Sequence, residues 1–167
     1  KQFDPYEFIK PEPLIFLLLV LNNKSLAPYS FHILSELCNE CDKLPLILLD
    51  HGILNHILPA EIDEIKSQLL FIFIRDIKNP ELEIQFIPYI QMMIQSNIVE
   101  VVYNGIQSFL SLNLYSKDPL APEDFKAEIQ QLSSFFLSNF QHIFELNEEK
   151  TISQYLIILS TIDNLPV

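Results

Sequence analysis

The residues best suited to chemistry lie close together in the first third of the chain. Cys38 and Cys41 form a Cys-x2-Cys pair, and His51 and His56 follow with four residues between them. Zinc sites made of two thiolates and two imidazoles use similar spacings. On a helix, however, both cysteines share an apolar stripe with Leu37, where thiols pack as small hydrophobic groups. We favour this packing interpretation and expect no metal or other cofactor; a zinc site at the four residues is the alternative.

A strip of polar residues on the same helix is a candidate binding surface. His32, Glu36 and Glu40 recur every four residues, and Asn39 lies beside them on the face opposite the apolar stripe. Two carboxylates on one face suit a basic ligand. An ordinary solvated face is the alternative interpretation.

The charge of the chain restricts its partners. The 167 residues carry a formal net charge of −12, and Arg75 is the only arginine. Nucleic-acid binding requires clustered lysine and arginine, which this sequence lacks, so a basic peptide or protein is the natural partner. The alternative is that the acidity only keeps the chain dissolved. Arg75 itself is expected to pair with the adjacent Asp76, or else with a carboxylate of a partner.

No pattern of residues indicates an enzyme. The chain has only two glycines, Gly52 and Gly105, so it has no glycine-rich phosphate loop, and no serine lies in a nucleophile-elbow context. Two acidic pairs, Asp63-Glu64 and Glu148-Glu149, fall at expected helix starts, where carboxylates complement the helix dipole. We therefore expect a non-enzymatic protein.

Cysteine content and hydrophobicity indicate where the chain resides. Two cysteines are too few for a disulfide framework, which indicates a reducing compartment, the cytoplasm or the nucleus. The most apolar run, residues 14–21, is eight residues long. Because a bilayer span needs about 20 residues, no association with a membrane is expected.

Apolar residues recur at spacings of three and four, which predicts an all-helical protein. A lead-in is expected over residues 1–12 and one helical domain over 13–167, either complete or as a fragment of a longer solenoid. The apolar stretch Leu44–Leu58 is expected to form two short helices joined by a turn at Gly52. The expected helices cover 13–22, 28–43, 44–58 with its turn, 61–79, 81–96 with a break at Pro88, 97–117, 123–146, and 151–164 with Thr151 as its N-cap.

An internal repeat connects these helices. Placing His32–Leu58 above Gln68–Ile94 gives a constant offset of 36 residues, at which apolar positions coincide and Gly52 meets Pro88. A period of this length is typical of helical solenoids, in which stacked units bury each other's apolar faces. The stretch Leu44–Leu58 is therefore expected to be part of a repeat unit.

The residues Leu34-Ser35-Glu36-Leu37 and Leu49-Asp50-His51-Gly52-Ile53-Leu54 resemble an armadillo repeat, most closely the repeats of importin-α. The resemblance implies a right-handed solenoid of about four helical pairs whose concave groove binds extended, Lys/Arg-rich localisation peptides. In that family a Trp and an Asn one helical turn apart hold the peptide, whereas this chain has no Trp. The groove residues that we expect are His32, Glu36, Asn39, Glu40, Gln68, Arg75, Gln107 and Ser111.

Two functions follow from these observations. The first is a protein-interaction scaffold that binds an extended, basic segment, in the form of an importin-α-like adaptor in nuclear transport. The second is a structural subunit of a larger assembly. Residues 14–21 favour the second, because a helix that is apolar on all sides must be buried or covered by a neighbour. Further repeats or subunits would then stack on the ends of the domain.

Overall fold

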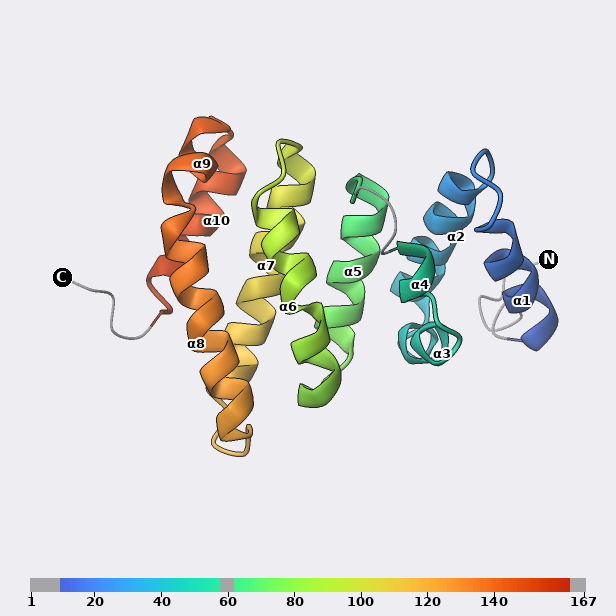
Figure 1. Ribbon diagram of the computed structural model, residues 1–167, viewed down its shortest axis with the longest axis horizontal. Coiled ribbons are helices and arrows are strands. Elements are labelled where there is room, and N and C mark those ends of the chain that lie inside the picture. Colours follow the sequence, from blue (N-terminus) through green and yellow to red (C-terminus); the bar gives the residue numbers. More distant parts are fainter. Residues whose placement is uncertain (1–9, 58–61, 163–167) are drawn as a thin grey trace. The chain divides into compact units, whose positions relative to one another are not determined.

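The computed structural model describes residues 10–57 and 62–162, and within them it contains ten helices and no strand (Figure 1). The all-helical prediction is therefore confirmed for this part of the chain. The chain divides into two compact units, Lys1–Asp76 and Ile77–Val167, which we call the N-terminal and C-terminal units. The helices are α1 (Pro11–Val20), α2 (Ala27–Glu40), α3 (Leu44–Asp50), α4 (Leu54–Ile57), α5 (Glu64–Asp76), α6 (Pro80–Ile94), α7 (Val99–Ser116), α8 (Glu123–Ser138), α9 (Phe140–Glu145) and α10 (Glu149–Leu159).

In the N-terminal unit, α2 is the central helix and packs against α1, α3 and α5. Helices α2 and α5 run parallel. The Lys66 ammonium lies 5.7 Å from the centroid of the Phe31 ring, and further along both helices Arg75 lies within electrostatic range of Cys38. The two residues of the first pair are 35 positions apart in the sequence and those of the second are 37 apart, close to the repeat offset of 36. The core is made of apolar residues from all of these helices: Leu14, Leu34, Leu37, Leu44, Leu48, Leu69 and Phe73.

The C-terminal unit places α6 against α7 and α8, and α10 against α7 and α9. Helices α7 and α10 also run parallel. The Gln107 amide donates a 3.0 Å hydrogen bond to Gln154, and the Asn113 amide donates a 3.1 Å bond to the Thr161 hydroxyl just after α10. Three aromatic rings join α7, α8 and α10 at the centre of this unit. Phe136 stacks between Phe109 and Tyr155, with 4.5 Å between ring centroids on each side.

The predicted turn within 44–58 is present, but the predicted break at Pro88 is wrong. Gly52 adopts a φ of 75°, which favours glycine, and it separates α3 from α4. Pro88 instead lies inside the continuous helix α6. A proline removes one backbone donor from a helix. Because Pro88 is exposed, water can bind the carbonyl oxygen that loses its partner.

The prediction of a single helix over 123–146 is also wrong, because this stretch divides into α8 and α9 at Asn139. The Asn139 side-chain amide donates a 2.9 Å hydrogen bond to the Phe135 carbonyl. This bond satisfies one of the carbonyl groups that a helix end leaves without a partner. A polar side chain, rather than a proline, therefore ends this helix.

Both ends of the described chain differ from prediction by a few residues. Helix α1 begins at Pro11, inside the expected lead-in, and residues 1–9 lie outside the described part of the chain. Helix α10 is capped by the Glu148 carboxylate, which accepts from the backbone N–H groups of Lys150 and Thr151, so Thr151 is not the cap. A carboxylate at this position also complements the helix dipole.

Gly105 allows α6 and α7 to approach closely. A Cβ atom at this position would lie 2.9 Å from Met93 Cβ and 3.2 Å from the Ile94 backbone nitrogen. Real Cβ contacts are longer, so a methyl group here would push the two helices apart. Alanine would otherwise be favoured in a helix by about 1 kcal/mol over glycine.

We expect Gly105→Ala to lower the free energy of unfolding by about 1–3 kcal/mol, because overpacking exceeds the gain in helix propensity. Urea unfolding followed by circular dichroism measures the change. Ser111→Ala on the half-buried side of the same helix is the control and should change stability little. A Gly105→Ala protein as stable as the wild type would show that the contact does not limit packing.

Candidate functional site

The polar strip predicted on the second expected helix lies on α2. His32, Glu36, Asn39 and Glu40 are all exposed there, while Phe31, Leu34, Leu37 and Cys38 on the other side of the helix are buried. Within the described residues, the carboxylates of Glu36 and Glu40 take part in no ion pair or hydrogen bond. Two adjacent carboxylates on this face are thus available to a ligand.

Helix α5 contributes fewer residues to the expected binding groove than predicted. Two of the three guanidinium nitrogens of Arg75, Nε and Nη2, donate hydrogen bonds of 2.7 Å and 2.8 Å to the Asp76 carboxylate, and the guanidinium lies 5.8 Å from the centroid of the Phe71 ring. These bonds to Asp76 raise the pKa of Arg75. The local pair that the sequence favoured is therefore present, and the half-buried Gln68 is the remaining groove candidate on this helix.

The eight expected groove residues divide between the two units. His32, Glu36, Asn39, Glu40, Gln68 and Arg75 belong to the N-terminal unit, and Gln107 and Ser111 belong to the C-terminal unit. On α7, the half-buried Gln107 is bonded to Gln154 and links α7 to α10. Ser111 lies one turn further along α7 and is half-buried.

The four residues considered for zinc are not grouped together in the structure. Cys38 and Cys41 are free thiols, each 1% exposed, and burial is the main cause that raises the pKa of Cys38 to about 12. The exposed His51 places Nδ1 2.8 Å from the Ile47 carbonyl oxygen. No group of three or more metal-ligating side chains occurs in the described residues.

A small pocket that the sequence did not reveal lies where α7 and α10 begin. Its volume is about 110 Å³, and it is lined by Val99, Glu100, Tyr103, Glu148, Lys150 and Thr151. The Lys150 ammonium lies only 4.1 Å from the centroid of the Tyr103 ring. This distance is typical of a cation held on the face of an aromatic ring.

Hydrogen bonds hold one carboxylate of this pocket in its charged form. The nearby Thr151 hydroxyl and backbone N–H, with the Lys150 N–H, lower the pKa of Glu148. Glu100 lies in the first turn of α7, where the helix dipole also favours negative charge. We call the Tyr103 ring with Glu100 and Glu148 the cation pocket. Because Tyr103 and Lys150 are 47 positions apart, no local sequence pattern brings them together.

The most strongly perturbed carboxyl group lies away from these surfaces. Glu83 on α6 is fully buried, and neither of its carboxylate oxygens has a hydrogen-bond partner within the described residues. Burial raises the pKa of Glu83 to about 7, although the positive charge of Lys78 opposes this shift. A carboxyl group of this kind binds a proton in the folded state more readily than in the unfolded state.

The fold and these surfaces define an all-helical protein made of packed helices with parallel helix pairs, α2 with α5 and α7 with α10. No protein-family model, curated protein or solved structure gave a significant match to the chain. Among the described helices, none is long and apolar enough to cross a bilayer.

We expect Glu83 to make stability depend on pH. Its pKa is raised from 4.5 to about 7 by folding, so the native state binds more protons than the unfolded state between these values. Stability is therefore full below about pH 4.5 and falls as the pH rises toward 7, by a loss on the order of 3 kcal/mol. Glu83→Gln should remove this loss.

Thermal unfolding between pH 5 and 8 measures this effect. The exposed Glu81, two residues earlier on the same helix, provides the matched control, and Glu81→Gln should keep the wild-type pH dependence. A Glu83→Gln protein with the wild-type slope would contradict the assignment.

Proposed function

We propose that the protein is a non-enzymatic interaction scaffold that binds an extended, basic segment of a partner protein. The observation that carries this proposal is the cation pocket, in which an ammonium group already lies on the Tyr103 ring beside Glu100 and Glu148. A ring flanked by carboxylates suits the lysine or arginine side chains of a partner. Lys150 occupies this position when no partner is bound.

The polar strip on α2 supports the same function. Glu36 and Glu40 are exposed and lie one helical turn apart. The spacing between their side chains is similar to the spacing between basic side chains on one side of an extended peptide. The net charge of −12 adds a long-range attraction for such a peptide. Exposed charge pairs contribute little singly, and affinity would come from several of them together.

The resemblance to armadillo repeats gives this proposal a specific form. In this form, the helices stack as a right-handed solenoid, and the protein acts in the cytoplasm or the nucleus as an adaptor that carries basic cargo segments. The parallel pairs α2–α5 and α7–α10 support such stacking, since the helices of each pair pack together and bury apolar side chains.

A structural role in a larger assembly is the second candidate, and α1 favours it. Ile15, Phe16 and Leu19 on α1 are 47%, 64% and 62% exposed, while Leu14 and Leu17 on the same helix are buried. The sequence predicted that this helix is buried or covered by a neighbour. An exposed apolar face of this kind is typical of a contact surface. Association through it would be insensitive to salt, unlike the binding of a basic peptide.

The strip on α2 is tested by reversing its charge. We expect the double variant Glu36→Lys, Glu40→Lys to bind a labelled lysine-rich peptide on the order of tenfold more weakly than the wild type, because two attractions become repulsions. Fluorescence anisotropy at low salt measures the affinity. Binding by the wild type should also weaken as salt is added.

The control reverses two charges elsewhere. Asp124 and Glu128 on α8 have the same spacing in sequence and lie outside the cation pocket, so Asp124→Lys, Glu128→Lys changes the net charge equally. Equal losses of peptide affinity in the two double variants would show that only the net charge of the protein affects binding. Unchanged binding by the α2 variant would rule out the strip as a binding surface.

The cation pocket is tested by removing its present occupant. We expect Lys150→Ala to bind the same peptide about threefold to tenfold more tightly, because the Tyr103 ring becomes available to a lysine of the peptide. Adding Tyr103→Leu should abolish this gain, whereas adding Tyr103→Phe should keep it, since phenylalanine retains the ring.

Lys126→Ala is the control, because it removes one positive charge from the same unit at a site outside the cation pocket. If Lys150→Ala and Lys126→Ala strengthen binding equally, the gain comes from charge alone. The cation pocket would then not be a ligand site.

A further inference from the structure

Helix α1 exposes an apolar stripe along one of its sides. Ile15, Phe16 and Leu19, which we call the α1 stripe, are 47%, 64% and 62% exposed. They follow Glu12 by three, four and seven positions, which is the spacing of residues that share one face of a helix. The other side of α1 packs against α2 and buries Leu14 and Leu17. The α1 stripe is therefore a second packing surface, which the described helices leave open.

The α1 stripe is free of charge in a strongly acidic chain. Glu12 is the only charged residue of α1, and residues 13–23 carry no charge at all. Because each chain has a net charge of −12, two copies repel each other wherever their carboxylates meet. At the α1 stripe, two copies can approach without bringing carboxylates together.

The charges at the two ends of α1 favour an antiparallel pair of these helices. Glu12 lies in the first turn of α1, and the exposed Lys24 follows shortly after its last turn. In a parallel pair the two Glu12 carboxylates would face each other. In an antiparallel pair, Glu12 of each copy lies at the end of the other α1, close to Lys24. The surface is thus complementary to itself, as a twofold interface requires.

The size of this surface determines how strong the contact is. Leu26 and Tyr29, which are 46% and 70% exposed, lie where the chain turns from α1 into α2 and add apolar area there. With the α1 stripe they expose on the order of 500 Å² per copy, against about 800 Å² per partner in a standard stable interface. A contact of this size predicts a dimer that dissociates in the micromolar range.

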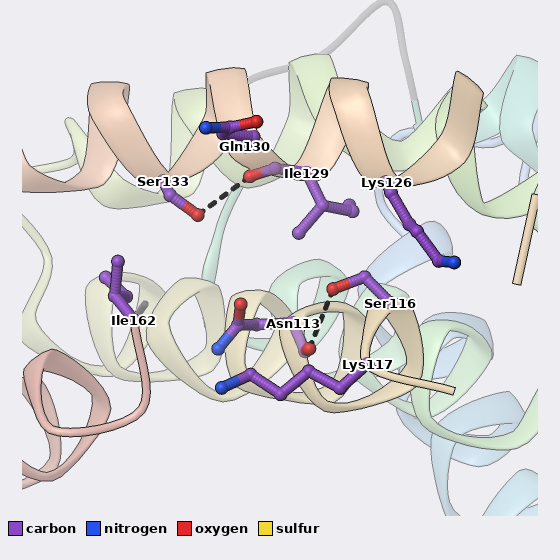
Figure 2. A pocket seen from close by; sticks show the side chains of 8 residues that line it. All are labelled: Asn113, Ser116, Lys117, Lys126, Ile129, Gln130, Ser133 and Ile162. Atoms are coloured by element: carbon purple, nitrogen blue, oxygen red, sulfur yellow. Dashed lines mark hydrogen bonds between the residues drawn. The ribbon is translucent and has the colours of Figure 1, made fainter. Parts of the chain in front are cut away.

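A cavity of about 420 Å³ between α7 and α8 in the C-terminal unit is a different kind of surface (Figure 2). Six of its eight lining residues are polar or charged, among them Asn113, Ser116 and Ser133. An apolar helix would remove water from these groups without offering them hydrogen bonds, which is costly. The α1 stripe, rather than this cavity, is therefore the surface suited to an apolar helix of another molecule.

We propose that the protein forms a homodimer in which the α1 stripe packs against the same stripe of a second copy, with the two α1 helices antiparallel. Phe16 and Leu19 lie in the contact, and Glu12 pairs with Lys24 of the second copy at each edge. The polar strip on α2 is not part of this contact. The inference rests on the structural role proposed for α1 and deepens it by naming the partner.

Sedimentation velocity of the whole chain, in a dilution series across the micromolar range, tests the proposal. We expect a reversible shift from the 19.5 kDa monomer to a species of twice this mass. Added salt should preserve or strengthen the dimer, because salt screens the repulsion between two acidic copies and leaves apolar burial intact. Binding of the lysine-rich peptide should weaken under the same change, so the two associations are distinguished.

The variant Leu19→Glu locates the contact on α1. We expect it to weaken the dimer on the order of a hundredfold, because a twofold axis places residue 19 in the interface twice. Leu156→Glu is the matched control, since Leu156 on α10 is 50% exposed and belongs to the C-terminal unit, and it should leave the dimer unchanged. Leu19→Glu should still bind the peptide as the wild type does, which separates loss of the dimer from loss of peptide binding.

Reversing charges at the edges of the contact tests its direction. Glu12→Lys and Lys24→Glu should each weaken the dimer about threefold to tenfold, because each places like charges beside one another. The double variant Glu12→Lys, Lys24→Glu should recover nearly the wild-type affinity, since it restores the pair in the opposite sense. A double variant weaker than both single variants would overturn the antiparallel arrangement.

Circular dichroism establishes that each variant is folded before its association is compared. A wild-type protein that stays monomeric throughout the dilution series would overturn the dimer, but not a contact of α1 with a different protein. Equal weakening by Leu19→Glu and Leu156→Glu would overturn the placement of the contact on α1. A dimer unchanged by Leu19→Glu would contradict both the proposed interface and the structural role of α1.

Discussion

The burial of one apolar stripe along each of two parallel helices is the constraint on which both units depend. In the N-terminal unit the stripe of α2 contains Leu34 and Leu37, and in the C-terminal unit the Phe109 ring of α7 stacks on Phe136, which stacks on Tyr155 of α10. Burial of such side chains contributes about 1.5–3 kcal/mol each. Once these stripes are buried, the other sides of the same helices face outward, and the polar strip on α2 lies there beside exposed apolar residues such as Ile33.

Long-range hydrogen bonds make the packing of the C-terminal unit specific. Apolar stripes tolerate sliding, whereas the bonds from Gln107 to Gln154 and from Asn113 to Thr161 are satisfied in one register only. Glu83 has the opposite character, since it is buried without a hydrogen-bond partner among the described residues and makes stability depend on pH. Polar groups therefore determine the alignment of the helices, and apolar burial supplies most of the stability.

The sequence predicted the helices because the spacing of apolar residues is a local signal. It predicted the candidate binding surfaces less well, because these depend on contacts between residues that are far apart in the sequence. The exposed strip on α2 followed from spacing alone. The breaks were harder to predict. The exposed Pro88 is tolerated inside helix α6, whereas the Asn139 side chain bonds to the carbonyl group at the end of α8. The contact between Tyr103 and Lys150 joins residues 47 positions apart, which no local pattern reports.

The placement of charge along α7 follows in part from the helix itself. Glu100 at its start and Lys117 at its end complement the helix dipole, so their signs alone need no ligand. The dipole does not explain the Tyr103 ring beneath an ammonium group, or a cavity that small serines leave open. Tyr103 and Lys117 are also about 20 Å apart along the helix. This separation exceeds the screening length of about 8 Å at physiological salt, so the charges at the two ends of α7 are screened from one another.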